Sequence, residues 1–129
     1  MRVFKNAWFE RFARKQRISD KVLLAAIECA EQGQIDADLG GGVIKQRLAR
    51  VGQGKSGGFR SIIFYRAAGR AFFVYGFAKS DQDNIDANEV AQFKKAAAHV
   101  LGLTDEQLAQ MICKGQFSEV QGNGEKVPE

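Results

Sequence analysis

Basic residues crowd the middle of the 129-residue chain, between Lys45 and Lys79, and no Asp or Glu interrupts them. Positive groups held this close repel one another unless an anion lies among them. Arginine offers planar, permanently charged donors that match phosphate oxygens, and a lysine crowded by other cations can accept a proton. The cluster therefore predicts a site that binds phosphate, and a phosphodiester is the candidate ligand. The eight basic residues are Lys45, Arg47, Arg50, Lys55, Arg60, Arg66, Arg70 and Lys79.

Other catalytic groups are scarce. His99 is the only histidine, and we expect it near the end of a helix, where a cation is favoured. Cys29 and Cys113 lie far apart without a CxxC spacing, so they predict reduced, buried thiols and no metal site. The sequence thus predicts no metal and no cofactor. A nuclease built on it has to orient the ribose 2′-OH and stabilise phosphorane charge with Arg and Lys, while Tyr65 or Tyr75 stacks on a base or donates a proton.

The glycine-rich stretch from Gly52 to Gly58 imitates two nucleotide-binding motifs. A P-loop ending at Gly54-Lys55-Ser56 would need a glycine where Ala49 stands, and a helix rather than a strand after it. The dinucleotide spacing fails on the same context. Two interpretations stay open: a flexible hairpin connection, or a loop that closely approaches a phosphodiester, which glycine permits because it has no Cβ.

The periodicity of the apolar residues predicts an α+β fold. Two helices come first, and Ser19 is the expected N-cap of the second. Strands follow with period-two alternation, and two S/T/D-x-x-E/Q capping boxes, at Asp86 and Thr104, predict two further helices. We expect an antiparallel meander with the two N-terminal helices packed on one face. A short edge strand is expected at 3–5, longer strands at 43–49, 59–66 and 70–77, and a flexible connection at 40–42.

Charge is distributed unevenly along the chain. Residues 1–80 carry a net charge of +9 and residues 81–129 a net charge of −5, which together give +4. The basic part is typical of a nucleic-acid-binding surface, although scattered surface cations are the common alternative.

The length predicts one domain over residues 1–121, with a core of about 1–101, a helical extension at 102–121 and a disordered tail at 122–129. No apolar run is long enough for a membrane span, and the N-terminus lacks the apolar stretch of a secretory signal. These features predict a cytoplasmic protein that does not bind a membrane.

Three stretches, taken in their order along the chain, resemble the RelE/ParE superfamily of bacterial toxins. They are IKQRLAR at 44–50, GQGKSGGFR at 52–60 and YGFAK at 75–79. The resemblance covers about residues 1–100 and is closest to the HigB-type branch of type II toxin–antitoxin systems. It implies a RelE-like fold, a small α+β domain with two N-terminal helices across one face of a mostly antiparallel sheet.

The resemblance also implies a ribosome-dependent endoribonuclease (an mRNA interferase) that works without a metal. A helix-turn-helix antitoxin would neutralise it, and the complex would bind operator DNA. Arg60 falls where the family stabilises the transition-state phosphate, and Lys45 and Arg47 where it stabilises charge or takes up a proton. Lys79, the fourth catalytic candidate, matches the lysine that ends the last core strand. Where RelE carries an arginine after that lysine, this chain has Ser80, and the resemblance assigns no general acid.

Three residues complete the candidate site as RNA or phosphate contacts: Lys55 in the basic loop, Arg50 and Tyr65. Two other functions fit the same sequence. A ParE-like poison of DNA gyrase would have this fold without nuclease activity, and a non-catalytic nucleic-acid-binding module would explain the basic half alone. The basic residues expected on the sheet face of Arg60 favour the nuclease, and the acidic C-terminal half disfavours the binding module.

Overall fold

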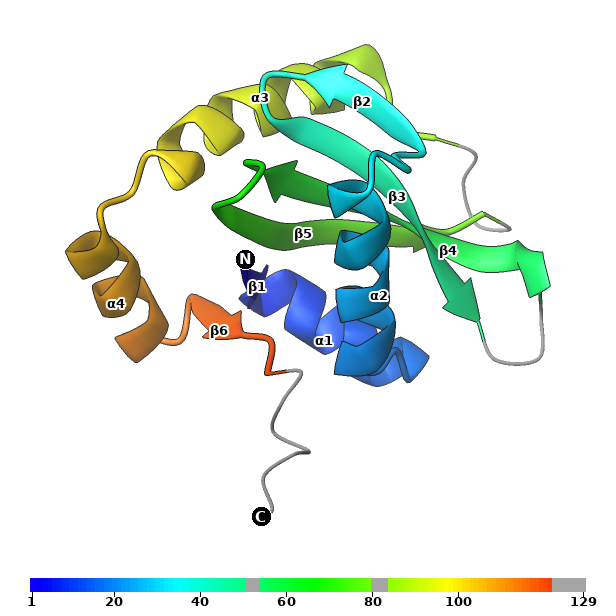
Figure 1. The fold of residues 1–129 in the computed structure, drawn as a ribbon, viewed down its shortest axis with the longest axis horizontal. Coiled ribbons are helices and arrows are strands. Elements are labelled where there is room, and N and C mark those ends of the chain that lie inside the picture. Colours follow the sequence, from blue (N-terminus) through cyan, green and yellow to red (C-terminus); the bar gives the residue numbers. More distant parts are fainter. Residues whose placement is uncertain (51–53, 80–83, 122–129) are drawn as a thin grey trace.

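A computed structural model describes residues 1–50, 54–79 and 84–121, and shows a six-stranded sheet with helices on both faces (Figure 1). The strand order across the sheet is β2-β3-β4-β5-β1-β6. The predicted α+β class is confirmed. The elements are β1 (Arg2–Asn6), α1 (Ala7–Gln16), α2 (Asp20–Glu31), β2 (Ala37–Gly40), β3 (Val43–Arg50), β4 (Gly54–Tyr65), β5 (Arg70–Ala78), α3 (Ala87–Leu101), α4 (Asp105–Cys113) and β6 (Phe117–Glu119).

The four strands β2 to β5 form the antiparallel meander that the alternation predicts. Strand β1 then joins β5 in parallel, pairing Phe4 with Phe72, and β6 pairs antiparallel with β1. The prediction of an edge strand near the N-terminus is therefore wrong, because β6 covers the outer side of β1. The connection at Gly40–Gly42 is a tight hairpin with positive φ at each glycine, rather than a flexible link.

Capping residues begin the helices where the sequence predicts. The Ser19 side chain accepts the Val22 N–H at the start of α2, and Gly33, just past its end, has a φ of 84°. The capping boxes at Asp86 and Thr104 are both closed reciprocally by the side chain three residues on. Both cysteines are free and exposed, so the prediction of buried thiols is wrong. Cys29 lies on the flank of α2, outside the buried stripe of Ala26, Ile27 and Ala30.

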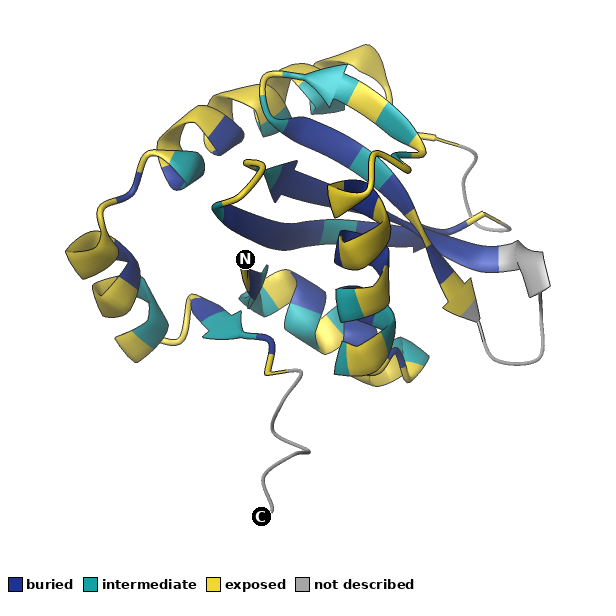
Figure 2. Ribbon diagram, viewed as in Figure 1, coloured by how far each residue is buried: buried dark blue, intermediate teal, exposed yellow. Residues whose placement is uncertain are grey.

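The central strands are largely buried (Figure 2), and the core has two parts, one on each face of the sheet. Helices α1 and α2 cover the first face, where Phe9 and Leu23 pack on Ile63 and Phe73. Helix α3 and the segment after it cover part of the second face, which includes Phe4, Ile62 and Phe64. This division matters for the site because the two faces carry different chemistry.

Candidate active site

Lys45, Arg47 and Arg60 lie on the face of the sheet opposite α1 and α2. Arg70 of β5 lies on the same face but is bound elsewhere, to the Leu103 carbonyl oxygen and to Asp105. Ile44, Gln46 and Leu48 of β3 face the helices, so the alternating residues Lys45 and Arg47 face the other way. Arg47 pairs directly with Arg60 of β4 in the antiparallel register, which places both side chains on one face. The convergence of basic residues around Arg60 is therefore found in the structure.

Arg60 is almost enclosed. Its side chain is 9% exposed, and its Nε atom lies 3.5 Å from the Oδ2 atom of Asp36. Its Nη1 atom is buried and has no hydrogen-bond partner within the described part of the chain. A buried polar group without a partner costs free energy, and a buried charge costs more. An anion whose oxygen reaches Nη1 would remove that cost, so the geometry is suited to binding phosphate.

Asp36 is the residue of this site that the sequence does not predict. Its carboxylate also contacts Arg47, with 3.5 Å between Oδ1 and the arginine Nε. Asp36 directly precedes β2, a strand of only four residues, and the sequence predicts a connection there. The three glycines Gly40–Gly42 are the sequence feature that could have predicted this role. A tight hairpin at these glycines pairs Ala37 with Lys45 and brings Asp36 beside β3.

The remaining lysines of the site lie at its rim. The Nζ atom of Lys45 donates to Oδ1 of Asn84 over 3.2 Å. Lys79 follows directly after β5 and is exposed, two residues beyond Phe77, which pairs with Arg60. The rim thus includes Lys45 of β3, Lys79 at the C-terminal end of β5, and Asn84, which precedes α3.

The two tyrosines lie on opposite faces of the sheet. Tyr65 packs against the core on the side of α1 and α2, so the structure does not bring it together with Arg60. Tyr75 pairs with Ile62 and packs with the core of the other face, where its ring lies 5.8 Å from that of Phe93 in α3. The same ring also stacks on Trp8 of α1 at a centroid distance of 4.8 Å. Burial raises the pKa of the Tyr75 hydroxyl above its usual value.

The glycine-rich stretch continues as strand. Gly54 opens β4 and pairs with Arg50 of β3, which confirms that no helix follows and that the P-loop interpretation is excluded. Gly52 and the side chains of Arg50 and Lys55 lie outside the described part of the structure, as does the predicted tail at 122–129.

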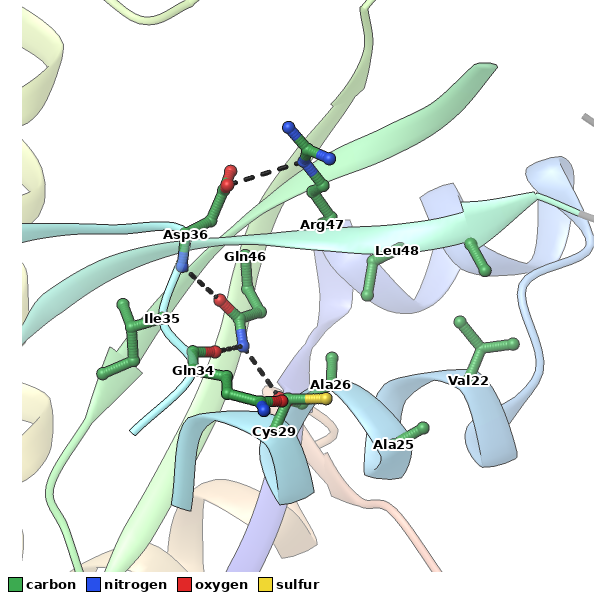
Figure 3. Close-up of a pocket in the computed structure, with 11 residues that line it drawn as sticks. Val22, Ala25, Ala26, Cys29, Gln34, Ile35, Asp36, Gln46, Arg47 and Leu48 are labelled. Carbon is green, nitrogen blue, oxygen red and sulfur yellow. Dashed lines mark hydrogen bonds and ion pairs between the residues drawn. The ribbon is translucent and has the colours of Figure 1, made fainter. Parts of the chain in front are cut away.

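An apolar pocket of about 680 Å³ lies between α2 and β3 (Figure 3). Val22, Ala25 and Cys29 line it from the helix, and Leu48 from the strand, while Arg47 points away from the helix. The pocket thus lies mainly on the helix side of β3, and it reaches Asp36 and Arg47, which also line it.

Within residues 1–50, 54–79 and 84–121, no group of three His, Cys, Asp or Glu side chains is placed so that it could bind a metal ion. In the same residues, no helix combines the length and apolar character needed to span a bilayer. The candidate site consists of the cations Lys45, Arg47 and Arg60, the carboxylate of Asp36 and the side-chain amide of Asn84.

Comparison with known proteins links this geometry to a family. Residues 1–120 match the family described as "RelE toxin of RelE / RelB toxin-antitoxin system". A comparison with curated proteins gives no match. The matched span contains the six strands of the described sheet, and with them Asp36, Lys45, Arg47 and Arg60.

Proposed function

We propose, since this chain belongs to the RelE toxin family, that it is an endoribonuclease that cleaves mRNA on the ribosome. The family implies a RelB-type antitoxin as its partner. We further propose a HigB-type toxin, a helix-turn-helix antitoxin encoded with it, operator binding by their complex, and action in the cytoplasm. The observation that carries the proposal is the buried Nη1 atom of Arg60, which has no partner among the described residues and lies beside Arg47 on one strand pair.

The proposed reaction uses the 2′-OH of the RNA as nucleophile. Arg60 and Arg47 bind the non-bridging oxygens of the scissile phosphate and stabilise the charge that grows on them during attack. Lys45, held by Asn84 at the rim, takes up the 2′-OH proton. The bond between phosphorus and the 5′-oxygen breaks, the leaving 5′-oxygen takes a proton from solvent water, and the products are a 2′,3′-cyclic phosphate and a 5′-hydroxyl. No step of this scheme calls for a metal or cofactor.

The other candidate residues surround the scissile phosphate. We propose that Lys79, the fourth catalytic candidate, adds positive charge from the end of β5. Arg50 and Lys55, at the far end of β3 and β4, neutralise neighbouring phosphates. Tyr75 lies on the face of Arg60 whereas Tyr65 does not, so we assign the contact with a base to Tyr75.

The test is cleavage of mRNA on programmed ribosomes by purified toxin, with the 5′ ends of the products mapped. Arg60→Ala should lower the cleavage rate about 10²- to 10³-fold, the usual effect of removing one group that stabilises transition-state charge. Arg66→Ala is the matched control, because Arg66 is exposed in the β4–β5 turn and should keep full activity. Equal rates for wild type and Arg60→Ala would refute the site. Absence of cleavage together with inhibited supercoiling by gyrase would instead support the ParE-like function.

A further inference from the structure

We propose that Asp36 is a positioning residue that fixes Arg47 and Arg60 through their Nε atoms and leaves their outer nitrogens to the scissile phosphate. The inference rests on the proposed function, because it names the residue that prepares the same site. One carboxylate serves both arginines: Oδ1 contacts Arg47 and Oδ2 contacts Arg60, each over 3.5 Å.

The choice of atoms on the arginines supports positioning. A carboxylate that saturates an arginine engages two nitrogens at once in a fork. The ion pair between Asp36 and Arg60 joins Oδ2 to Nε, and the Nη1 atom of the same guanidinium stays buried and unpartnered among the described residues. Because a guanidinium is planar, a contact at Nε sets the direction of the whole group. Asp36 therefore orients Arg60 without occupying the donor that phosphate would use.

Asp36 is itself held from the opposite face of the sheet (Figure 3). Its backbone N–H donates to Oε1 of Gln46 over 2.8 Å. The Nε2 atom of Gln46 donates to the carbonyl oxygens of Ala26 in α2 and of Gln34, each over 3.0 Å. Gln46 is 4% exposed, and these three bonds use both donors and the acceptor of its amide. A chain of contacts thus runs from α2 through Gln46 to Asp36 and ends at the arginines.

A different role for Asp36 would give the opposite result. If the carboxylate mainly blocked the site as a counter-ion, RNA would have to displace it, and its removal would speed cleavage. If it positions the arginines, its removal lowers kcat because the donors lose their alignment. Removal also makes the site more positive, so RNA binding is not weakened. Because a loss of folded protein would also lower the apparent kcat at unchanged KM, the folded fraction of each variant is measured by urea denaturation beside the kinetics.

The experiment compares Asp36→Asn with Asp38→Asn, which removes the same charge two residues away. Asp38 is exposed, and its carboxylate accepts the Gly40 N–H. On programmed ribosomes we expect Asp36→Asn to lower kcat about 10- to 100-fold, with KM no higher than in wild type, and Asp38→Asn to match wild type. Asp36→Glu should recover part of the loss. A kcat of Asp36→Asn within about threefold of wild type, or above it, overturns the inference.

A second readout separates this inference from the proposed function. In ¹⁵N NMR of the purified toxin, the Nε–H signals of Arg47 and Arg60 should shift and exchange faster in Asp36→Asn than in Asp38→Asn. Unchanged signals would overturn the positioning role, even in a protein that cuts no RNA. Absence of cleavage by wild type, with shifted signals in Asp36→Asn, would overturn the proposed function and leave the role of Asp36 standing.

Discussion

Replacing Arg60 with Met should lower the cleavage rate about 10²- to 10³-fold, as in Arg60→Ala, and leave the protein at least as stable as wild type. Arg60 is nearly enclosed, its Nη1 atom lacks a partner in the described structure, and Lys45 and Arg47 share its face. These features make the buried charge unfavourable in the free protein. Methionine keeps an unbranched apolar chain of similar reach, which adapts to the space that the arginine stem fills.

The size of the effect follows from two opposing contributions. Removing a buried, unsatisfied donor stabilises the fold by about 1–3 kcal/mol. Losing the contact to Asp36 costs about 0.5–1 kcal/mol, because that side chain is 25% exposed and keeps Arg47 as a partner. The net expectation is a gain of about 1 kcal/mol, which raises Tm by about 3–5 °C for a chain of this length.

Urea and thermal denaturation of the purified protein measure this gain, and cleavage on ribosomes measures the loss of function. Arg47→Met is the matched control: the Arg47 side chain is 52% exposed, so its replacement should change stability by less than about 0.5 kcal/mol. A loss of more than about 2 kcal/mol in Arg60→Met would refute the reasoning. It would mean that the fold already compensates the charge of Arg60, and the argument for a missing anion would fail.

Two further predictions concern the face of α1 and the tyrosine near the site. Gly76→Ala should destabilise the fold by about 2–3 kcal/mol, because the new Cβ would lie 2.5 Å from the Phe12 ring. Urea denaturation of the double variant should show that Phe12→Leu relieves part of that loss, and strictly additive losses would contradict this. Because burial raises the pKa of Tyr75 above 10.0, its neutral form contributes stability that is complete below that pH and is lost as pH rises through the raised pKa. Denaturation midpoints at increasing pH should therefore fall less steeply in Tyr75→Phe, and an equal slope would count against the prediction.

Most of the fold follows from patterns that span many residues. The strands β3, β4 and β5 are long enough for alternation to be unambiguous, and the capping boxes mark where α3 and α4 begin. Strands β2 and β6 have four and three residues, too few to show a period, and only pairing with β3 and β1 makes them strands. The parallel pairing of β1 with β5 depends on tertiary packing, which local sequence does not encode.

The candidate site could be predicted from the sequence only where the alternation of side chains along a strand decides which face a residue occupies. Lys45 and Arg47 are two residues apart on one strand, so they share a face, and the register adds Arg60. Tyr65 is five residues from Arg60 on the same strand, and an odd spacing places it on the other face, against α1 and α2. Asp36 depends on a turn and on a buried amide from a neighbouring strand, and neither leaves a periodic trace.

The position of β1 inside the sheet has a consequence for the order of folding. The meander from β3 to β5 joins neighbours in sequence, whereas β1 pairs Arg2 with Arg70. Long-range pairing closes a large loop and is entropically costly, so we expect the meander to form in the folding transition state and β1 and β6 to join afterwards. Substitutions in β1 should then mainly speed unfolding, and those in the meander should slow folding. The strands that carry Lys45, Arg47 and Arg60 would belong to the nucleus.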